Sequence, residues 1–132
     1  MSRELTWLTL TVILTGVLWI PYILDRIMVR GLMGAMANPM PKDEPQSLWA
    51  QRLMRAHTNA VENLVIFAAL VLTLQALHHS TATTVIACAV FFYARLAHAV
   101  VYTLGIPVLR TLAFAVGFAA EVALVLAVFE KL

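Results

Sequence analysis

The sequence predicts an all-α integral membrane protein that forms one four-helix bundle. Hydrophobic residues make up 62% of the 132 residues and charged residues only 12%, whereas a soluble domain has about 45–50% apolar and about 25% charged residues. The apolar residues gather in four continuous runs, each long enough for the roughly 20-residue helix that crosses a bilayer. A membrane barrel would instead show segments of about 10 residues that alternate apolar and polar.

Breaks in the apolar pattern separate the helices of this single domain, residues 1–132. The expected helices cover about residues 5–30, 47–77, 81–104 and 108–130. The one long connection, about residues 31–46, has three prolines between positions 39 and 45, which exclude a helix there. Residues 78–80 and 105–107 form short turns, so we expect antiparallel neighbours. Pro21 is expected to kink the first helix.

Charge and cysteine content exclude several function classes. The formal net charge of +2 is too small and too scattered for nucleic-acid binding. Cys88 is the only cysteine, so no intrachain disulfide forms, and its place in an apolar run indicates a buried, inert thiol. The adjacent His78 and His79 do not by themselves make a metal site, and we expect none.

The distribution of basic residues predicts the orientation in the membrane. Basic residues are concentrated in the long connection and its flanks, whereas the second connection carries none. Cytoplasmic loops of membrane proteins carry an excess of lysine and arginine. We therefore expect the long connection in the cytoplasm and both termini outside, with the protein in a bacterial inner membrane.

Two series of polar residues interrupt the second and third helices. Arg55, Asn59 and Glu62 follow one another at i, i+4 and i+7, a spacing that puts all three on one helix face. The third helix repeats this at i, i+3 and i+7, with the residues Arg95, His98 and Tyr102. Ionisable side chains inside a membrane are costly and face a partner or a cavity.

All these polar groups lie in the half of the membrane nearest to the long connection. Arg110 and Thr111 open the fourth helix in the same half, and Arg30 closes the first. One interpretation is a set of salt bridges within the bundle, such as Arg95 with Glu62. The excess of arginines over acidic residues favours another, an anionic ligand held by paired N–H donors.

The motif in the second helix resembles a known family. Residues 55–62, RAHTNAVE, resemble the R-A-x-x-N-x-x-E signature of the MAPEG family, the membrane-associated proteins in eicosanoid and glutathione metabolism. Residues 94–98, ARLAH, followed by Tyr102, resemble its third-helix pattern, and Asn38-Pro39 and Arg30 also match. The resemblance covers nearly the whole chain and indicates a bacterial-type member.

The resemblance implies a homotrimer of four-helix subunits that binds glutathione between neighbouring subunits. Glu62 would take the ammonium group of glutathione and the arginines its carboxylates, while Arg110 and Thr111 would act catalytically beside the sulfur. The residues implied to bind glutathione are Arg30 (from the neighbouring subunit), Arg55, Asn59, Glu62, Arg95, His98 and Tyr102. The implied activity is that of a glutathione transferase or peroxidase acting on hydrophobic electrophiles from the lipid.

Two departures from the family pattern leave other functions open. Thr58 stands where several members have an arginine, and Phe114 where some have a tyrosine. One alternative is therefore a non-catalytic relative that binds a lipid or amphipathic anion. Another is a small proton-coupled multidrug exporter that uses Glu62 or Glu121, although four arginines would not suit a cation pathway. Otherwise we expect a structural role for Glu121, which either hydrogen-bonds across a subunit interface or is simply protonated.

Overall fold

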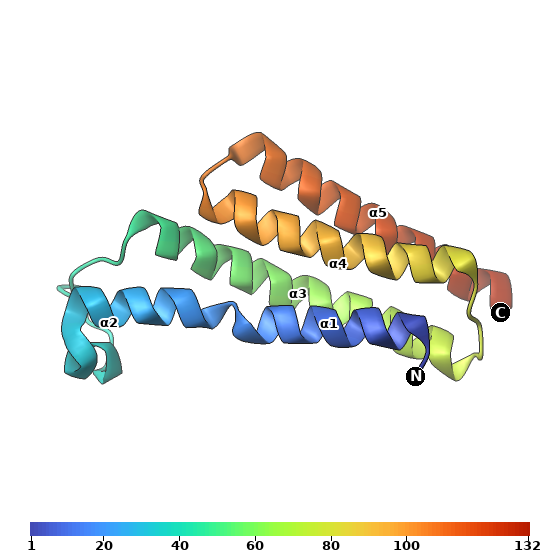
Figure 1. Cartoon of the computed structure of the whole chain (residues 1–132), viewed down its shortest axis with the longest axis horizontal. Helices are drawn as coiled ribbons and strands as arrows, with labels where there is room; N and C mark the ends of the chain where they lie inside the picture. The colour runs from blue at the N-terminus through green and yellow to red at the C-terminus, as the bar shows by residue number, and fades with distance from the viewer.

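Four long helical rods, which alternate in direction, make up the whole protein. The computed structural model describes residues 1–132, and all its regular elements are α-helices. The elements are α1 (Arg3–Val17), α2 (Trp19–Met36), α3 (Leu48–Ala76), α4 (Ala82–Thr103) and α5 (Pro107–Lys131). α1 and α2 together form the first rod, and both chain termini lie at the same end of the bundle (Figure 1). Four helices are long and apolar enough to cross a membrane, which confirms the predicted architecture.

The first rod is interrupted at Leu18, between α1 and α2. Pro21 causes the break, because it lacks the N–H that would bond to the carbonyl of Val17, and its ring clashes with that carbonyl. Pro21 itself lies in the first turn of α2, where the missing N–H is not needed. The kink predicted from Pro21 is therefore present, one turn ahead of the proline.

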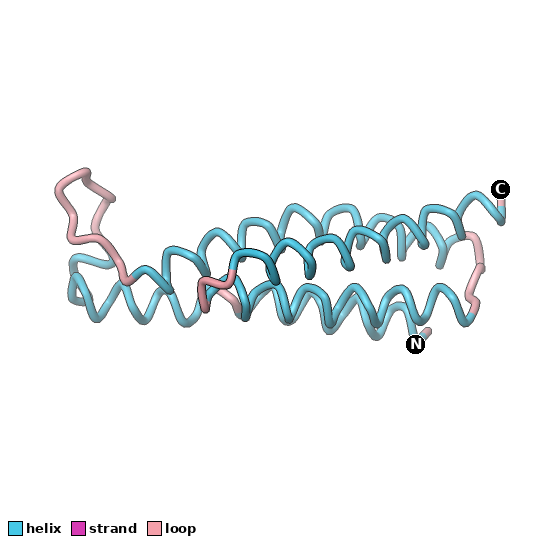
Figure 2. The backbone as a smooth tube through the Cα atoms, turned by 90° about the horizontal axis from the view of Figure 1, so that it is seen from above, coloured by secondary structure: helices cyan, strands magenta, loops and turns pink.

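A short helical segment follows the first rod after Gly31. The helical conformation is interrupted at Gly31, next to the expected end near residue 30, and resumes as far as Met36, so the connection without helical structure spans residues 37–47 instead of 31–46. Gly31, with φ 72° and ψ 166°, is not helical but adopts a backbone conformation that favours glycine, so the straight helix is interrupted there by a kink. The first proline of the connection is Pro39, so nothing prevents a further turn of helix after the bend. Figure 2 shows the connection projecting at the far end of the bundle.

The core of the bundle is small and the apolar surface is large. Phe67 and Phe91 stack with ring centroids 4.0 Å apart, and Cys88 beside them is fully buried, as its sequence context predicted. Only 26 of the 132 residues are buried, so most large apolar side chains face outward, Val65 and Phe118 among them. An apolar surface of this extent requires lipid as its solvent. The protein is therefore an integral, multi-pass membrane protein.

The start of α3 is held by a carboxylate from α2. Asp25 is buried, and its Oδ2 accepts the backbone N–H of Ser47 at 3.1 Å and the side-chain amide of Gln46 at 3.2 Å. The Ser47 hydroxyl donates to Asp25 Oδ1 at 2.5 Å. Ser47 is the residue that caps α3, so this contact determines where α3 begins relative to the first rod.

The turn between α4 and α5 lies against the side of α3. Gly105, at φ 78°, has no side chain, and a Cβ placed there would lie 2.9 Å from the guanidinium carbon of Arg52. This contact sets Arg52 level with the end of α4. Because α3 and α4 are antiparallel, the polar residues that follow Arg52 on α3 lie level with those that precede Gly105 on α4.

Candidate functional site

The polar residues of α3 and α4 meet at Asn59 and Arg95. Arg95 is only 3% exposed, and its Nη2 donates a hydrogen bond to the side-chain oxygen of Asn59. The same nitrogen lies 3.4 Å from Nδ1 of His98, one helical turn further along α4. The guanidinium is therefore held between the two helices by an amide oxygen and an imidazole.

From His98 the contacts continue to α5. The His98 ring packs edge-on against Tyr102, with ring centroids 5.5 Å apart. The guanidinium carbon of Arg110 lies over the face of Tyr102, 4.4 Å from the ring centroid, which is a cation–π contact. The structure thus brings predicted site residues from α3, α4 and α5 into one series of contacts. We refer to Asn59, Arg95, His98, Tyr102 and Arg110 as the polar ladder.

Arg55 and Glu62 flank Asn59 on α3 but do not join the ladder. Both side chains are exposed on this subunit, and neither forms an ion pair or a side-chain hydrogen bond within the chain. The salt bridge considered between Arg95 and Glu62 is absent, because Arg95 is bonded to the neutral Asn59 instead. Each of these two charges therefore faces away from its own bundle.

The acidic neighbour of Arg95 is Glu121 on α5. Glu121 is 3% exposed, and its Oε1 has no hydrogen-bond partner, like the buried Nε of Arg95. The two groups interact electrostatically without forming a direct salt bridge. Glu121 therefore lies inside the subunit, beside Arg95 of α4. Gly117, one turn earlier, leaves room for Arg95 beside α5.

Arg30 and Thr111 have other partners in the single subunit. Arg30 lies on α2 and donates from Nε to the carbonyl of Glu44 at 2.8 Å, with Nη1 3.8 Å from the carboxylate of Asp43. It makes no hydrogen bond or ion pair to the polar ladder. The Thr111 hydroxyl donates to the carbonyl of Pro107 at 3.3 Å, and its side chain is exposed. Thr111 and Arg110 line a shallow cavity of about 330 Å³ at the start of α5.

Comparison with known families identifies the group of proteins to which this site belongs. The sequence model of the MAPEG family matches residues 5–129, nearly the entire chain. The chain belongs to the MAPEG family. A comparison with curated proteins gives no match. The MAPEG assignment confirms the resemblance drawn from residues 55–62, and places this membrane protein in glutathione-related or eicosanoid metabolism in general.

The structure shows the surroundings of Thr58 and Phe114, the two residues that depart from the MAPEG family pattern. The Thr58 hydroxyl donates to the Met54 carbonyl at 3.1 Å, so it is bonded within its own helix. Phe114 lies on α5, one turn after Arg110, and is 37% exposed. A phenylalanine has no hydrogen-bonding group. Both positions therefore supply fewer donors than the family pattern would provide.

Three polar contacts in this MAPEG protein were not predicted. They are Arg52 against Gly105, Glu121 beside Arg95, and Asp25 at the start of α3. Arg52 had a sequence signal, because it lies three residues before Arg55 and so extends the polar face of α3. The other two depend on which helices are neighbours, and no spacing within a single helix contains that information. No group of three or more His, Cys, Asp or Glu side chains is arranged to hold a metal ion.

Proposed function

We propose that this MAPEG protein binds glutathione at the polar ladder and the adjoining face of α3. The bound thiol then reacts with a hydrophobic substrate from the lipid, either by conjugation to an electrophile or by reduction of a lipid peroxide to the alcohol and water, in which a second glutathione completes the disulfide. Arg55 and Glu62 are the observation that carries the proposal. They are charged, exposed and without an intrachain ion pair on a helix that can cross the membrane. Such charges require a polar partner, because lipid cannot solvate them.

The charges around the ladder match those of glutathione, which carries two carboxylates and one ammonium group. Glu62 can accept the ammonium group, while Arg55 and Arg95 can hold carboxylates through paired N–H donors. The buried Nε of Arg95 has no hydrogen-bond partner in the chain. Asn59, His98 and Tyr102 orient Arg95 and line the same space.

Catalysis in this proposal depends on the start of α5. Glutathione supplies a thiol whose deprotonated form is the nucleophile and reductant. Arg110, placed beside the sulfur, favours the charged thiolate over the neutral thiol. Thr111 can turn its weakly held hydroxyl to donate a hydrogen bond to the same sulfur.

A single subunit supplies only part of the proposed site. We propose a homotrimer in which Arg30 of one subunit completes the site on the next, while the exposed faces of α3 become subunit contacts. In this arrangement the connection between α2 and α3 lies in the cytoplasm, as its basic flanks predict, and both termini lie outside.

The exporter alternative is disfavoured by the surroundings of its two candidate glutamates. Such a transporter needs a membrane-embedded carboxylate that a cationic drug can reach. Glu121 is buried and shares its surroundings with Arg95, and Glu62 lies on the same helix face as Arg55. The other alternative is a non-catalytic relative that binds lipid or another anion. Measuring turnover distinguishes it from an enzyme.

Binding is tested by thermal unfolding of the purified protein in detergent with millimolar glutathione. We expect the wild type to be stabilised, by about 2.7 kcal/mol at a concentration 100 times the Kd. Arg55→Ala and Glu62→Gln each remove one charged contact, worth about 1.5–3 kcal/mol, so binding should weaken roughly 10- to 100-fold. Arg3→Ala is the matched control, an exposed arginine without an ion pair at the other end of the bundle. No stabilisation of the wild type would overturn the proposal.

Turnover is tested with a chromogenic electrophile under the same conditions. We expect conjugation by the wild type, and a rate at least tenfold lower for Arg110→Gln, because the cation that favours the thiolate is lost. The Kd for glutathione should change much less in this variant. Binding without conjugation of an electrophile or reduction of a lipid peroxide would favour the non-catalytic relative.

A further inference from the structure

A second polar cavity lies at the opposite end of the bundle, beside the chain termini. It has a volume of about 210 Å³ and is enclosed by the first turn of α1, the end of α3 and the turn between α3 and α4. The residues that line it are Glu4, Val71, Leu74, Gln75, His78, His79 and Ser80. None of them belongs to the polar ladder or to the proposed glutathione site.

Glu4 is the buried charge of this cavity. Its side chain is 3% exposed, and its Oε1 accepts hydrogen bonds from the hydroxyls of Ser80 at 2.7 Å and Thr84 at 2.6 Å. Its other oxygen, Oε2, is also buried but has no partner. Two hydroxyls thus hold one oxygen of the carboxylate in place, and the other oxygen has no partner within the chain.

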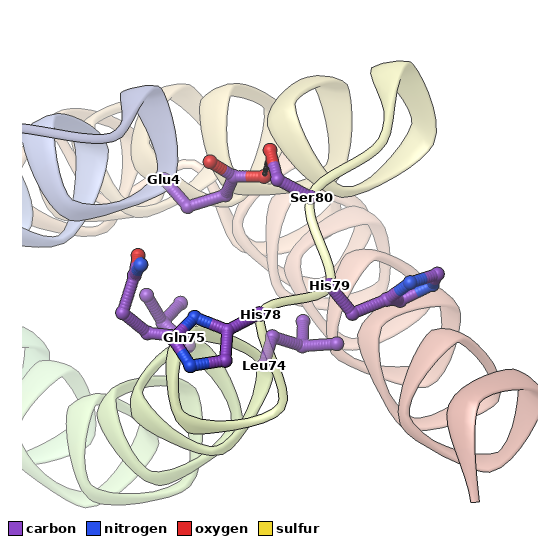
Figure 3. Close-up of a pocket in the computed structure, with 7 residues that line it drawn as sticks. Glu4, Leu74, Gln75, His78, His79 and Ser80 are labelled. Atoms are coloured by element: carbon purple, nitrogen blue, oxygen red, sulfur yellow. Dashed lines mark hydrogen bonds between the residues drawn. The ribbon is translucent and has the colours of Figure 1, made fainter.

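No cation of the chain neutralises Glu4. Arg3 is next in sequence, but its side chain is exposed and makes no ion pair with Glu4. Figure 3 shows His79 directed away from Glu4 toward α5, where its Nε2 lies 4.0 Å from the carboxylate of Glu130. A buried carboxylate is stable only when it is paired and hydrogen-bonded, or when it binds a proton. The cavity therefore lacks a positive charge that would balance the carboxylate of Glu4.

The other side chains of the cavity supply further acceptors. Gln75 and His78 lie across the opening from Glu4 (Figure 3). The side-chain oxygen of Gln75 accepts one hydrogen bond, from the Ser2 hydroxyl at 2.7 Å, and retains a second lone pair. A neutral imidazole at His78 offers one acceptor nitrogen. Carboxylate, amide oxygen and imidazole together provide three acceptors around one small space.

We propose that this cavity binds a primary ammonium group. Such a group carries one positive charge and three N–H donors, which matches one carboxylate and two neutral acceptors. The cavity lacks the group of three or more ligating side chains that a metal ion needs. It also lacks the aromatic walls that hold a quaternary ammonium, because its apolar residues are Val71 and Leu74.

The position of the cavity allows two sources for the ammonium group. The cavity lies where the rods end, near the level at which the bilayer meets water, and Gln75 and His78 at its opening are exposed. The headgroup of an aminophospholipid reaches this level from the membrane, and a free alkylamine reaches it from solution. Both present the same chemistry to Glu4, so the experiment needs one arm for each.

The lipid arm compares bilayer discs of phosphatidylcholine with discs that contain equal parts of phosphatidylethanolamine. We expect phosphatidylethanolamine to raise the unfolding temperature of the wild type by several degrees. Glu4→Gln should abolish this difference, because its amide keeps an acceptor toward Ser80 and Thr84 but turns an N–H₂ donor toward the cavity. Glu130→Gln is the matched control, an exposed carboxylate at the same end that does not line the cavity, and should respond like the wild type.

The solution arm uses phosphatidylcholine discs with ethanolamine hydrochloride or choline chloride at equal concentration. Stabilisation by ethanolamine but not by choline, lost in Glu4→Gln, supports the site for a free amine. If Glu4→Gln does not fold, Gln75→Leu removes one acceptor at the cavity opening without disturbing the buried carboxylate, and amine binding should weaken at least tenfold. The proposal is overturned if neither amine source stabilises the wild type. It is equally overturned if choline acts as well as ethanolamine, or if no cavity variant changes the response.

Discussion

The hydrogen bond between Asn59 and Arg95 is the contact that joins α3 to α4 at the candidate site, and Asn59→Leu removes it. Leucine resembles asparagine in size but cannot accept a hydrogen bond. Arg95 is 3% exposed, its Nε has no partner, and the only other hydrogen-bonding neighbour of its guanidinium is His98 at 3.4 Å. The variant therefore leaves a buried cation with almost no direct acceptor.

The size of the effect follows from the charge on Arg95. Hydrogen bonds between membrane helices contribute about 0.6 kcal/mol on average and at most about 1.7, whereas bonds to charged groups contribute about 1.5–3 kcal/mol. Because Arg95 has no other good acceptor, we expect Asn59→Leu to lower the unfolding free energy by about 2 kcal/mol, within the range for bonds to charged groups. With an unfolding entropy of roughly 2.1 cal/mol/K per residue for 132 residues, this lowers the unfolding temperature by roughly 7 °C.

The chain contains a matched control one turn along the same helix. Asn63 donates only to the main-chain carbonyl of Asn59, at 2.8 Å, so its amide makes no bond between helices. Asn63→Leu should lower the unfolding temperature by less than roughly 3 °C. Both variants are measured in detergent without glutathione, so that ligand binding does not contribute to the difference.

A double-mutant cycle isolates the pair itself. Arg95→Met removes the cation, and in that background Asn59→Leu should have little further effect, which gives a coupling of about 1–2 kcal/mol. Equal losses for the Asn59 and Asn63 variants would refute the reasoning. Strict additivity of Asn59→Leu and Arg95→Met would refute it as well.

Two further substitutions, Gly105→Ala and Asp25→Ala, test the ends of the helices, and Gly16→Ala is the comparison for the first. Gly105→Ala should lower the unfolding free energy by about 1–3 kcal/mol, because the backbone is left-handed there and the new Cβ meets Arg52. Gly16→Ala, in a helix with open space around it, should instead raise it by up to about 1 kcal/mol, and similar unfolding temperatures for the two variants would contradict this. Asp25→Ala removes the acceptor for the N–H and hydroxyl of Ser47 and should destabilise the start of α3 by about 1–3 kcal/mol. Limited proteolysis should then cut the connection before α3 faster, and an unchanged rate would count against a role in holding it.

Part of the candidate site could be predicted because helical spacing is regular. The spacing of Asn59 on one helix, and of Arg95 and His98 on another, determined that these residues share faces in the same half of the membrane. Their direct contact agrees with that prediction. Spacing says nothing about how far each helix is rotated toward its neighbour, so the sequence could not distinguish Asn59 from Glu62 as the partner of Arg95.

The same limit explains why the neighbour of Glu121 could not be predicted. From the sequence it is a single acid in an apolar run, with no polar residue at helical spacing that would pair with it on α5. Its neighbour belongs to α4, and only the packing of α4 on α5 brings the two together. Glu4 is a clearer case of neighbours that only packing brings together, because its hydroxyl partners Ser80 and Thr84 are distant in sequence.

The sequence by itself determined that the chain crosses the membrane four times, because hydropathy and length depend on each segment alone. It also determined the family, through residues 55–62. The tertiary structure decided which charges are paired and which face outward. It buried Arg95 and Glu121 within the subunit and left Arg55 and Glu62 on its surface. The physical reason is that the fate of a charge inside a membrane depends on its neighbours in space, and those neighbours are set by how whole helices pack together.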